Sequence, residues 1–402
     1  MNIKRVSYFD YLFFLLFLLM ASWSAFNEWL PKRIILNFVY FYFLARIILN
    51  YFQKKIYVSY NSFLVVIICF ISIFWSEFPI ISLKFSVYLF FETLIMIYMA
   101  NTYHYREVLK IFFISGLIIT ILSYVVAVFL PELGIDQLKH IGSWEGVFTH
   151  KNNLAETLSF YIIIGLFILI KEEKVKCKIF YYAIFISQVL LIILSKSTTG
   201  LILLAVTILL TVFLILFNQI RNIYLKASMT VFSIGLLMSL LTILIIYISE
   251  FLNIFGKDTT FTGRNIIWEA GLKLISFNWF EGYGYRTTII EGSYFYNYFI
   301  SYINFNVWTL HNGYLETISY IGIMGVITIV YGLSIYLFRS IRLFTYNNSK
   351  DITNFLPISF LIYMLILNTQ ESAFIGSEFS LIWCFYVYIH VYLKTKGTLN
   401  NV

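Results

Sequence analysis

The segment HNGYLETISYIGIMG, residues 311–325, places a histidine where a polar stretch gives way to an apolar run. Imidazole is the side chain whose unperturbed pKa lets it take or give a proton near neutral pH. If the apolar run spans a bilayer, an ionisable group at its boundary is costly to bury and is a candidate for function. His311 is therefore our candidate general base. The alternative is a histidine that only hydrogen-bonds at a helix start.

Polar and small residues accompany this histidine. Asn312 follows it directly, Glu316 lies one turn further along the expected helix, and Gly322 and Gly325 share one face of that helix. Small residues let helices approach closely. We expect the two glycines to seat the helix that carries His311, and we assign Asn312 and Glu316 to substrate binding.

Three further polar clusters interrupt the apolar background. They are GVFTHKNNLAE at 146–156, SKSTTG at 195–200 and TGR at 262–264. Each has an ordinary alternative: Asn152 or Asn153 as a helix cap, the serine cluster as a capped turn, and the glycine of TGR as a bend. A histidine and a lysine beside two asparagines are more polar than a cap requires. We therefore assign His150, Lys151 and Asn152 to substrate binding.

Two arginines lie in the polar stretch that precedes His311. A guanidinium presents a planar fork of donors suited to the oxygens of a phosphate. Arg264 and Arg286 are thus candidate groups for holding a diphosphate. The alternative is ion pairing with Glu269, Glu281 or Glu291 in the same loop, where exposed pairs are worth about 0 to 1 kcal/mol.

The composition is that of a polytopic membrane protein. Of 402 residues, 60% are apolar, 20% aromatic and only 12% charged. Lys4 and Arg5 precede an apolar run without a convincing cleavage site, so we expect an uncleaved first span. The cysteines Cys69, Cys177 and Cys384 have neither a metal-ligand spacing nor a disulfide framework. No cofactor is expected.

The apolar runs predict about 12 transmembrane helices in a single integral domain, residues 1–402. The expected spans are 9–26, 34–52, 61–76, 82–100, 108–130, 154–170, 179–195, 200–218, 227–249, 312–338, 355–370 and 375–393. With both termini cytoplasmic, seventeen of the 28 basic residues fall inside and nine outside. The positive-inside rule supports this orientation and explains the net charge of +8 without nucleic acid.

The polar clusters collect on the outer side of these spans. Two outer connections are long: residues 131–153 and, much larger, residues 250–311. The larger loop contains IIWEAGLKLI, which has amphipathic helical spacing, so we expect it to be ordered. One membrane domain with one outer cap is the simplest organisation.

Several expected spans contain ionisable groups. In hydrocarbon such groups should face the bundle interior or a water-filled cavity. The segment SEFPIISLK at 76–84 lies at an outer boundary and is expected to help line that cavity. The groups are Arg46, Lys84, Glu92, Glu156 and Glu316.

The chain resembles the O-antigen ligase and O-antigen polymerase superfamily of bacterial membrane glycosyltransferases. The family signature is a histidine, then Asn, Ser or Gln, then nine residues and Gly-x-x-Gly. His311, Asn312, the nine residues 313–321, Gly322 and Gly325 match it.

Two other segments extend the resemblance. GVFTHKNNLA is similar to the family's Gly-x-Phe-x-His-Lys-Asn motif through Gly146, Phe148 and the three residues that follow Thr149. TGRNIIW, which is followed by GYGY, resembles its outer-loop arginine segment through Gly263, Arg264 and Trp268.

The resemblance implies an all-α, GT-C-like glycosyltransferase of the bacterial inner membrane with its site facing the periplasm. It implies no metal, no nucleotide sugar, and undecaprenyl-diphosphate-linked oligosaccharide as donor and acceptor. The bilayer is a second partner and a chain-length regulator a further candidate.

One departure bears on the reaction. Ligases of lipopolysaccharide usually carry an arginine where this sequence has Thr198 and Thr199, with Lys196 the nearest basic residue and a candidate for substrate binding. That favours a polymerase, which joins glycan repeat units, over a ligase, which transfers glycan to lipid A core or protein. A lipid-linked oligosaccharide flippase is the alternative from another class. It would require polar groups near the midplane and often broken helices, and the sequence shows neither clearly.

The expected mechanism uses three catalytic residues. Arg264 and Arg286 would clamp the diphosphate and stabilise charge on the leaving group. His311 would deprotonate or orient the acceptor hydroxyl, with inversion at the anomeric carbon.

Overall fold

The structure is a computed structural model that describes residues 6–22, 30–51, 56–220, 224, 228, 264–303, 309–346, 352–376 and 380–399. Every extended regular element in these ranges is a helix, and an isolated bridge pairs Ile135 with Trp144. The expectation of an all-α fold is confirmed.

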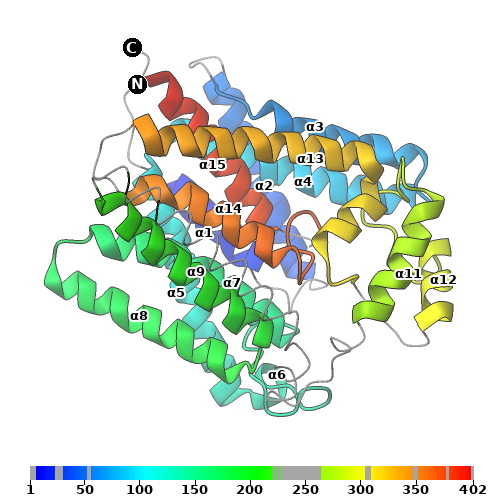
Figure 1. Ribbon diagram of the computed structural model, residues 1–402, viewed down its shortest axis with the longest axis horizontal. Helices are drawn as coiled ribbons and strands as arrows, with labels where there is room; N and C mark the ends of the chain where they lie inside the picture. The colour runs from blue at the N-terminus through cyan, green and yellow to red at the C-terminus, as the bar shows by residue number, and fades with distance from the viewer. Residues whose placement is uncertain are drawn as a thin grey trace.

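The helices follow one another along the chain with few long connections (Figure 1). In order they are α1 (Tyr8–Ser22), α2 (Leu30–Tyr51), α3 (Tyr60–Ile71), η2 (Ser72–Phe74), α4 (Pro79–Thr102), α5 (Tyr105–Phe129), α6 (Pro131–Gly134), α7 (Lys151–Lys171), α8 (Val175–Leu194), α9 (Thr198–Gln219), α11 (Arg264–Phe277), α12 (Tyr294–Ile303), α13 (Gly313–Tyr346), η4 (Ile352–Phe355), α14 (Leu356–Leu367) and α15 (Leu381–Leu399).

Five of the described helices are long and apolar enough to cross a membrane. They are Pro79–Thr102, Tyr105–Phe129, Lys151–Lys171, Val175–Leu194 and Gly313–Leu343. The polytopic prediction is therefore confirmed. The count of twelve spans stays a prediction, because the expected span 227–249 lies, except for residue 228, outside the described residues. Each of the other expected spans overlaps a helix.

Helix α15 forms the centre of the bundle. Every residue from Leu381 to Val391 is buried, and the helix packs on α4 and α13 with further contacts to α1 and α14. The ring of Phe385 meets Phe112, Phe160 and Phe360 edge to face, at centroid distances of 5.1, 5.3 and 4.7 Å. Burial of these large apolar rings holds α5, α7 and α14 around α15.

An ion pair with a buried carboxylate joins the first two helices. Arg46 on α2 donates from Nε and Nη2 to the carboxylate of Asp10 on α1, at 3.0 and 3.1 Å. The hydroxyls of Tyr42, Tyr98 and Tyr103 donate to the same carboxylate. Arg46 thus finds its partner on another helix, as expected for an ionisable group inside a span.

Helix α13 is broken at Gly322. This residue has φ 60° and ψ −167°, a conformation essentially restricted to glycine. A Cβ there would lie 2.1 Å from the carbonyl oxygen of Phe280. Gly325 has no positive φ, and a Cβ on it would first meet the side chain of Ile321 in the same helix. The expected span 312–338 is therefore a helix with a break inside it, and Gly322 acts by interrupting the helix rather than by seating it.

The backbone of residues 279–284 fills the interruption. Freed peptide groups of a broken helix need new partners at membrane depth. The hydrogen bonds that supply them are Tyr283 N to Ser319 O at 2.8 Å, Gly284 N to Tyr320 O at 3.0 Å and Ile323 N to Trp279 O at 2.9 Å. The outer loop is therefore attached directly to the helix that follows His311.

The described part of the large outer loop is ordered, as expected. Helices α11 and α12 lie together at one end of the molecule (Figure 1). They share a small core in which Ile267 and Leu274 pack with Phe295, Phe299 and Leu310. This cap holds the first residue of α11, Arg264, against the ends of the other helices.

Candidate active site around Glu371

His311 lies in the turn before α13 with its backbone in the left-handed region, at φ 49°. Asn312 caps the helix, because its Oδ1 accepts hydrogen bonds from the amides of Tyr314 and Leu315 at 3.0 and 3.1 Å. The imidazole Nδ1 of His311 lies 3.0 Å from Oε2 of Glu371. The cap and the turn therefore direct the imidazole toward a carboxylate on another segment.

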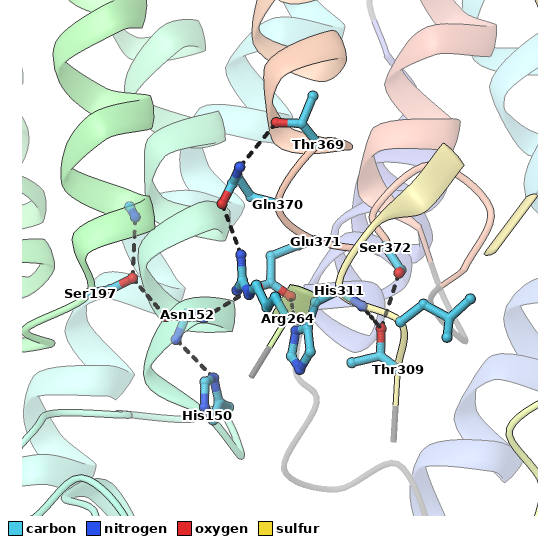
Figure 2. A network of polar contacts seen from close by, with 12 residues as sticks. His150, Asn152, Ser197, Arg264, Thr309, His311, Thr369, Gln370, Glu371 and Ser372 are labelled. Carbon is cyan, nitrogen blue, oxygen red and sulfur yellow. Dashed lines mark hydrogen bonds and ion pairs between the residues drawn. The ribbon is translucent and has the colours of Figure 1, made fainter. Parts of the chain in front are cut away.

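Glu371 is the hub of the site, and it lies in the link between α14 and α15 (Figure 2). Its Oε1 accepts from Nη2 of Arg264 at 3.0 Å and from Nδ2 of Asn152 at 2.8 Å. Arg264 also donates from Nη1 to Oε1 of Gln370 at 2.8 Å. The side chains of Glu371 and Arg264 are only 10% and 11% exposed, so this is a partly desolvated ion pair. Three predicted site residues from distant parts of the chain meet at one carboxylate.

Asn152 is fixed from two sides at the start of α7. Its Oδ1 accepts from the hydroxyl of Ser197 at 2.8 Å, and the same hydroxyl accepts from the amide of Gly200 at 3.2 Å. The cap of α7 is His150, whose Nδ1 accepts from the amide of Asn152 at 3.2 Å. The alternative that Asn152 caps the helix is therefore wrong, whereas the capped turn at Ser197 is confirmed.

The surroundings of Glu371 keep it ionised. Burial raises the pKa of its carboxyl, but the hydrogen bond and charge of His311 and the charge of Arg264 outweigh burial, and the net pKa lies below the usual value. Burial lowers the pKa of His150 to about 4, although Glu371 opposes that shift. His150 is thus a neutral hydrogen-bonding group near pH 7.

Arg264 has a different partner from those considered in its own loop. The alternative of pairing with Glu269, Glu281 or Glu291 is wrong, because its fork binds Gln370 and Glu371. The guanidinium that was expected to meet a diphosphate is occupied with holding the site carboxylate.

Arg286 lies on another wall of the site. Its guanidinium carbon is 4.1 Å from the ring centroid of Phe85, a cation–π contact. Its Nη1 is buried without a hydrogen-bond partner, and no carboxylate of the described residues forms an ion pair with it. Arg286 therefore retains donor capacity for a ligand.

Backbone strain coincides with the predicted site. Three non-glycine residues of the described part have positive φ: Lys196 at 52°, Arg286 at 59° and His311 at 49°. Such conformations cost free energy and persist where the surroundings enforce them, which is frequent at functional sites. All three were chosen from the sequence as site residues.

A cavity of about 550 Å³ opens beside Glu371. Lys84, Glu156 and Glu316 line it, which confirms that ionisable groups of the expected spans face a cavity. Ile81 and Lys84 also place the segment 76–84 on its wall, as expected. Arg286 and Glu371 complete the charged lining, so the cavity combines cations, carboxyl groups and hydroxyls.

Glu316 braces the turn that carries His311. Its Oε1 accepts from the amide of Leu310 at 2.7 Å and from the hydroxyl of Thr309, and its Oε2 accepts from Tyr320 at 2.9 Å. With both oxygens bonded inside the protein, this geometry favours a positioning role over direct substrate binding.

The two lysines of the candidate set lie apart from this cavity lining. Lys151 is the first residue of α7 and is partly buried, whereas Lys196 is exposed in the turn before α9. A Cβ added to Gly142 would lie 3.4 Å from Nζ of Lys196, so this side chain reaches toward the smaller outer loop. Neither lysine lines the cavity.

Glu371 is the site residue that the sequence reasoning missed. The signal that could have found it is the run NTQES at 368–372, a polar interruption between two apolar runs. The expected spans 355–370 and 375–393 leave this carboxylate in a link of four residues, to which the sequence analysis assigns no role.

No group of three or more His, Cys, Asp or Glu that could hold a metal ion occurs in the described ranges. The ionisable groups that the structure brings together at the site are the imidazole and carboxylate pair and the neighbouring cations.

The fold and the site define a multi-pass helical membrane protein with a polar site where its helices end. A model of the O-antigen ligase family matches residues 183–330, from α8 to the second part of α13. This match confirms the resemblance to the O-antigen ligase and polymerase superfamily, and the family implies a glycosyltransferase-like enzyme. No curated protein matches the chain. Arg264, Arg286 and His311 lie within the matched range, whereas Asn152 and Glu371 lie outside it.

Proposed function

We propose that this protein is a polysaccharide polymerase that joins undecaprenyl-diphosphate-linked glycan repeat units at the periplasmic face of the inner membrane. The observation that carries the proposal is the contact of His311 with Glu371, a carboxylate that lines a cavity together with Lys84 and Arg286. A base held in one orientation, with cationic side chains nearby, suits the transfer of a sugar from a diphosphate to a hydroxyl.

His311 acts as the general base. When Glu371 accepts the hydrogen bond from Nδ1–H, the imidazole is held in the tautomer whose Nε2 is open to take a proton. Arg264 and Asn152 fix the carboxylate that does this, so both act as positioning residues.

Arg286 and Lys84 bind the departing diphosphate. Cations placed in advance where charge develops stabilise the transition state, and loss of one such contact commonly costs about 2.7 to 4 kcal/mol. This assignment revises the diphosphate clamp expected from the sequence, with Arg286 retained and Lys84 in the place of Arg264.

The reaction is a single displacement. The acceptor hydroxyl gives its proton to His311 and its oxygen forms the new bond to the anomeric carbon. The bond from that carbon to the diphosphate breaks, and the diphosphate leaves with the electron pair. Attack opposite the leaving group inverts the anomeric configuration.

The choice of polymerase over ligase rests on the start of α9. Thr198 and Thr199 occupy the place of the arginine usual in lipopolysaccharide ligases, and Lys196 is not part of the cavity lining. The broken α13 resembles a transporter feature, but the residues that fill the break come from the outer loop, and the polar clusters meet at one end of the bundle.

The experiment is the surface-glycan banding pattern of a deletion strain, complemented with wild type or with His311→Ala. A single repeat unit on the surface lipid in the deletion and the mutant supports a polymerase. Loss of all surface glycan, with long polymer on undecaprenyl diphosphate, indicates a ligase. Lipid-linked repeat units trapped on the cytoplasmic side indicate a flippase. Normal polymer from stably inserted His311→Ala would refute the assigned chemistry.

A further inference from the structure

Two residues that line the same cavity each have a buried polar atom without a hydrogen-bond partner: a carboxyl oxygen in one and a guanidinium nitrogen in the other. Oε2 of Glu156 and Nη1 of Arg286 are both inaccessible to solvent, and neither has a hydrogen-bond partner in the described part of the chain. A buried polar atom without a partner costs free energy, so such atoms call for an explanation. Glu156 and Arg286 thus line the cavity with polar groups whose hydrogen bonds are not all made within the described part of the protein.

Glu156 belongs to a polar face of α7 that turns toward the cavity. Asn153, Glu156, Thr157 and Phe160 all line it, and their spacing places them on one side of the helix. The face offers an amide, a carboxyl group and a hydroxyl, with no cation, whereas the Phe160 ring is almost fully buried in the core. The three polar groups match the hydroxyls of an uncharged sugar.

The backbone of this face is held in place. The carbonyl of Glu156 accepts a hydrogen bond from the hydroxyl of Tyr363 on α14 at 2.7 Å, and the Phe160 ring packs against Phe360 and Phe385. The Glu156 side chain therefore projects from a rigid element, as a specificity contact should.

The cations of the cavity come from other segments. Lys84 and Phe85 belong to α4, and Arg286, Ile289 and Ile290 to the outer loop. Positive charge beside apolar side chains suits a diphosphate at the head of a lipid. The cavity lining is thus divided between a cationic and apolar part and the cation-free face of α7.

We propose that the α7 face of Asn153, Glu156 and Thr157 is the subsite for the acceptor sugar, with Glu156 accepting a hydrogen bond from a sugar hydroxyl. The inference rests on the proposed function and deepens it. Asn152, on the same helix, holds the carboxylate that orients His311. The rigid helix α7 therefore positions the acceptor sugar directly and, through Glu371, helps to position the base that removes its proton.

This division predicts that acceptor sugar and lipid diphosphate bind independently. The test uses two probes on purified protein carrying His311→Ala, so that no turnover occurs. One probe is the free oligosaccharide repeat unit, released by mild acid from lipid-linked repeat units of the source strain. The other is undecaprenyl diphosphate without sugar. Affinities are measured with Glu156→Gln and with Arg286→Lys added.

Glu156→Gln is expected to weaken oligosaccharide binding about tenfold and to leave undecaprenyl diphosphate binding unchanged, since an NH₂ group, which cannot accept a hydrogen bond, replaces one carboxyl oxygen. Arg286→Lys is expected to do the reverse. Glu107→Gln, at an exposed carboxylate paired with Lys110, is the matched control and should alter neither. Asn153→Ala is a second variant of the same face and should also weaken the oligosaccharide alone.

Unchanged oligosaccharide affinity in both Glu156→Gln and Asn153→Ala would overturn the subsite. Equal weakening of both probes by Glu156→Gln would overturn it too, because the residue would then serve the cavity as a whole. Failure of the proposed function looks different. In that case polymer forms normally in cells with His311→Ala, whatever the oligosaccharide affinities are.

Discussion

The imidazole Nδ1 of His311 lies 3.0 Å from Oε2 of Glu371, although sixty residues separate the two in the chain. The second oxygen of Glu371 is bonded to Arg264 and Asn152, so the carboxylate cannot rotate without breaking three contacts. A base held by a carboxylate, which is held in turn by other groups, is the arrangement that fixes one imidazole tautomer.

Glu371→Gln is expected to lower the rate of polymer formation by roughly 10² to 10⁴, the usual contribution of a positioned general base. The amide keeps the shape of the carboxylate but removes the charge that stabilises the protonated imidazole. The measurement is polymer formation by purified protein from lipid-linked repeat units. Glu107→Gln is the control, and a Glu371→Gln rate within a factor of two or so of wild type would contradict this role.

Arg264→Lys tests whether the arginine positions Glu371 or binds the diphosphate. Lysine keeps the charge but not the fork that bonds Gln370 and Glu371 together, so polymer formation should fall clearly. The affinity for undecaprenyl diphosphate should stay unchanged, whereas Arg286→Lys should weaken it.

The pair Arg264→Lys and Glu371→Gln should also be non-additive. Two substitutions that break the same contact remove its effect only once. The double variant should therefore be little slower than Glu371→Gln alone. Full additivity of the two effects, or weaker diphosphate binding in Arg264→Lys, would assign Arg264 directly to the substrate.

The helices could be predicted from the sequence because a membrane-spanning helix depends on the composition of its own segment. A span needs about 20 apolar residues, and such runs are visible without tertiary information. The convergence of Arg264, His311 and Asn152 also followed from topology, since all three were placed on the outer side. What topology cannot show is which contacts form there, and Arg264 was therefore assigned to a substrate instead of to Glu371.

Glu371 and the break at Gly322 depend on the tertiary structure. Glu371 is one carboxylate in a short link, and only the packing of α7 and α11 around it reveals its partners. Gly322 was expected to favour close packing, which small residues commonly do. Its positive φ arises because the backbone of Phe280 occupies the space beside it, a contact between segments distant in the sequence.

Gly322→Ala should therefore destabilise the protein much more than Gly325→Ala. At Gly322 the methyl group would meet the Phe280 backbone at 2.1 Å, and the backbone conformation alone costs an alanine about 1–3 kcal/mol. At Gly325 the neighbour is a side chain of the same helix, which can move. Thermal unfolding of the purified variants in detergent measures the difference. Equal melting temperatures would mean that the break is not enforced by the loop.

Acidification should destabilise the protein through His150. Burial holds its pKa at about 4 in the folded state against 6.5 unfolded, so the unfolded chain binds more protons between these values. Its contribution to stability is complete above about pH 6.5 and is lost as the pH falls toward 4. His150→Asn keeps a capping acceptor but does not titrate, so its melting temperature should fall less than that of wild type between pH 7 and pH 5.

Glu145, in the smaller outer loop, should have the opposite effect on stability: acidification should stabilise the protein through this residue. Burial and the nearby charge of Asp136 raise its pKa to about 7 from 4.5, so between these values the folded state binds more protons. Its contribution is complete below about pH 4.5 and is lost as the pH rises to about 7. Glu145→Gln removes the gain in stability that protonation of Glu145 gives on acidification. The melting temperature of the variant should therefore fall more than that of wild type between pH 7 and pH 5. Parallel pH profiles for wild type, His150→Asn and Glu145→Gln would show that neither group is buried as the structure has it.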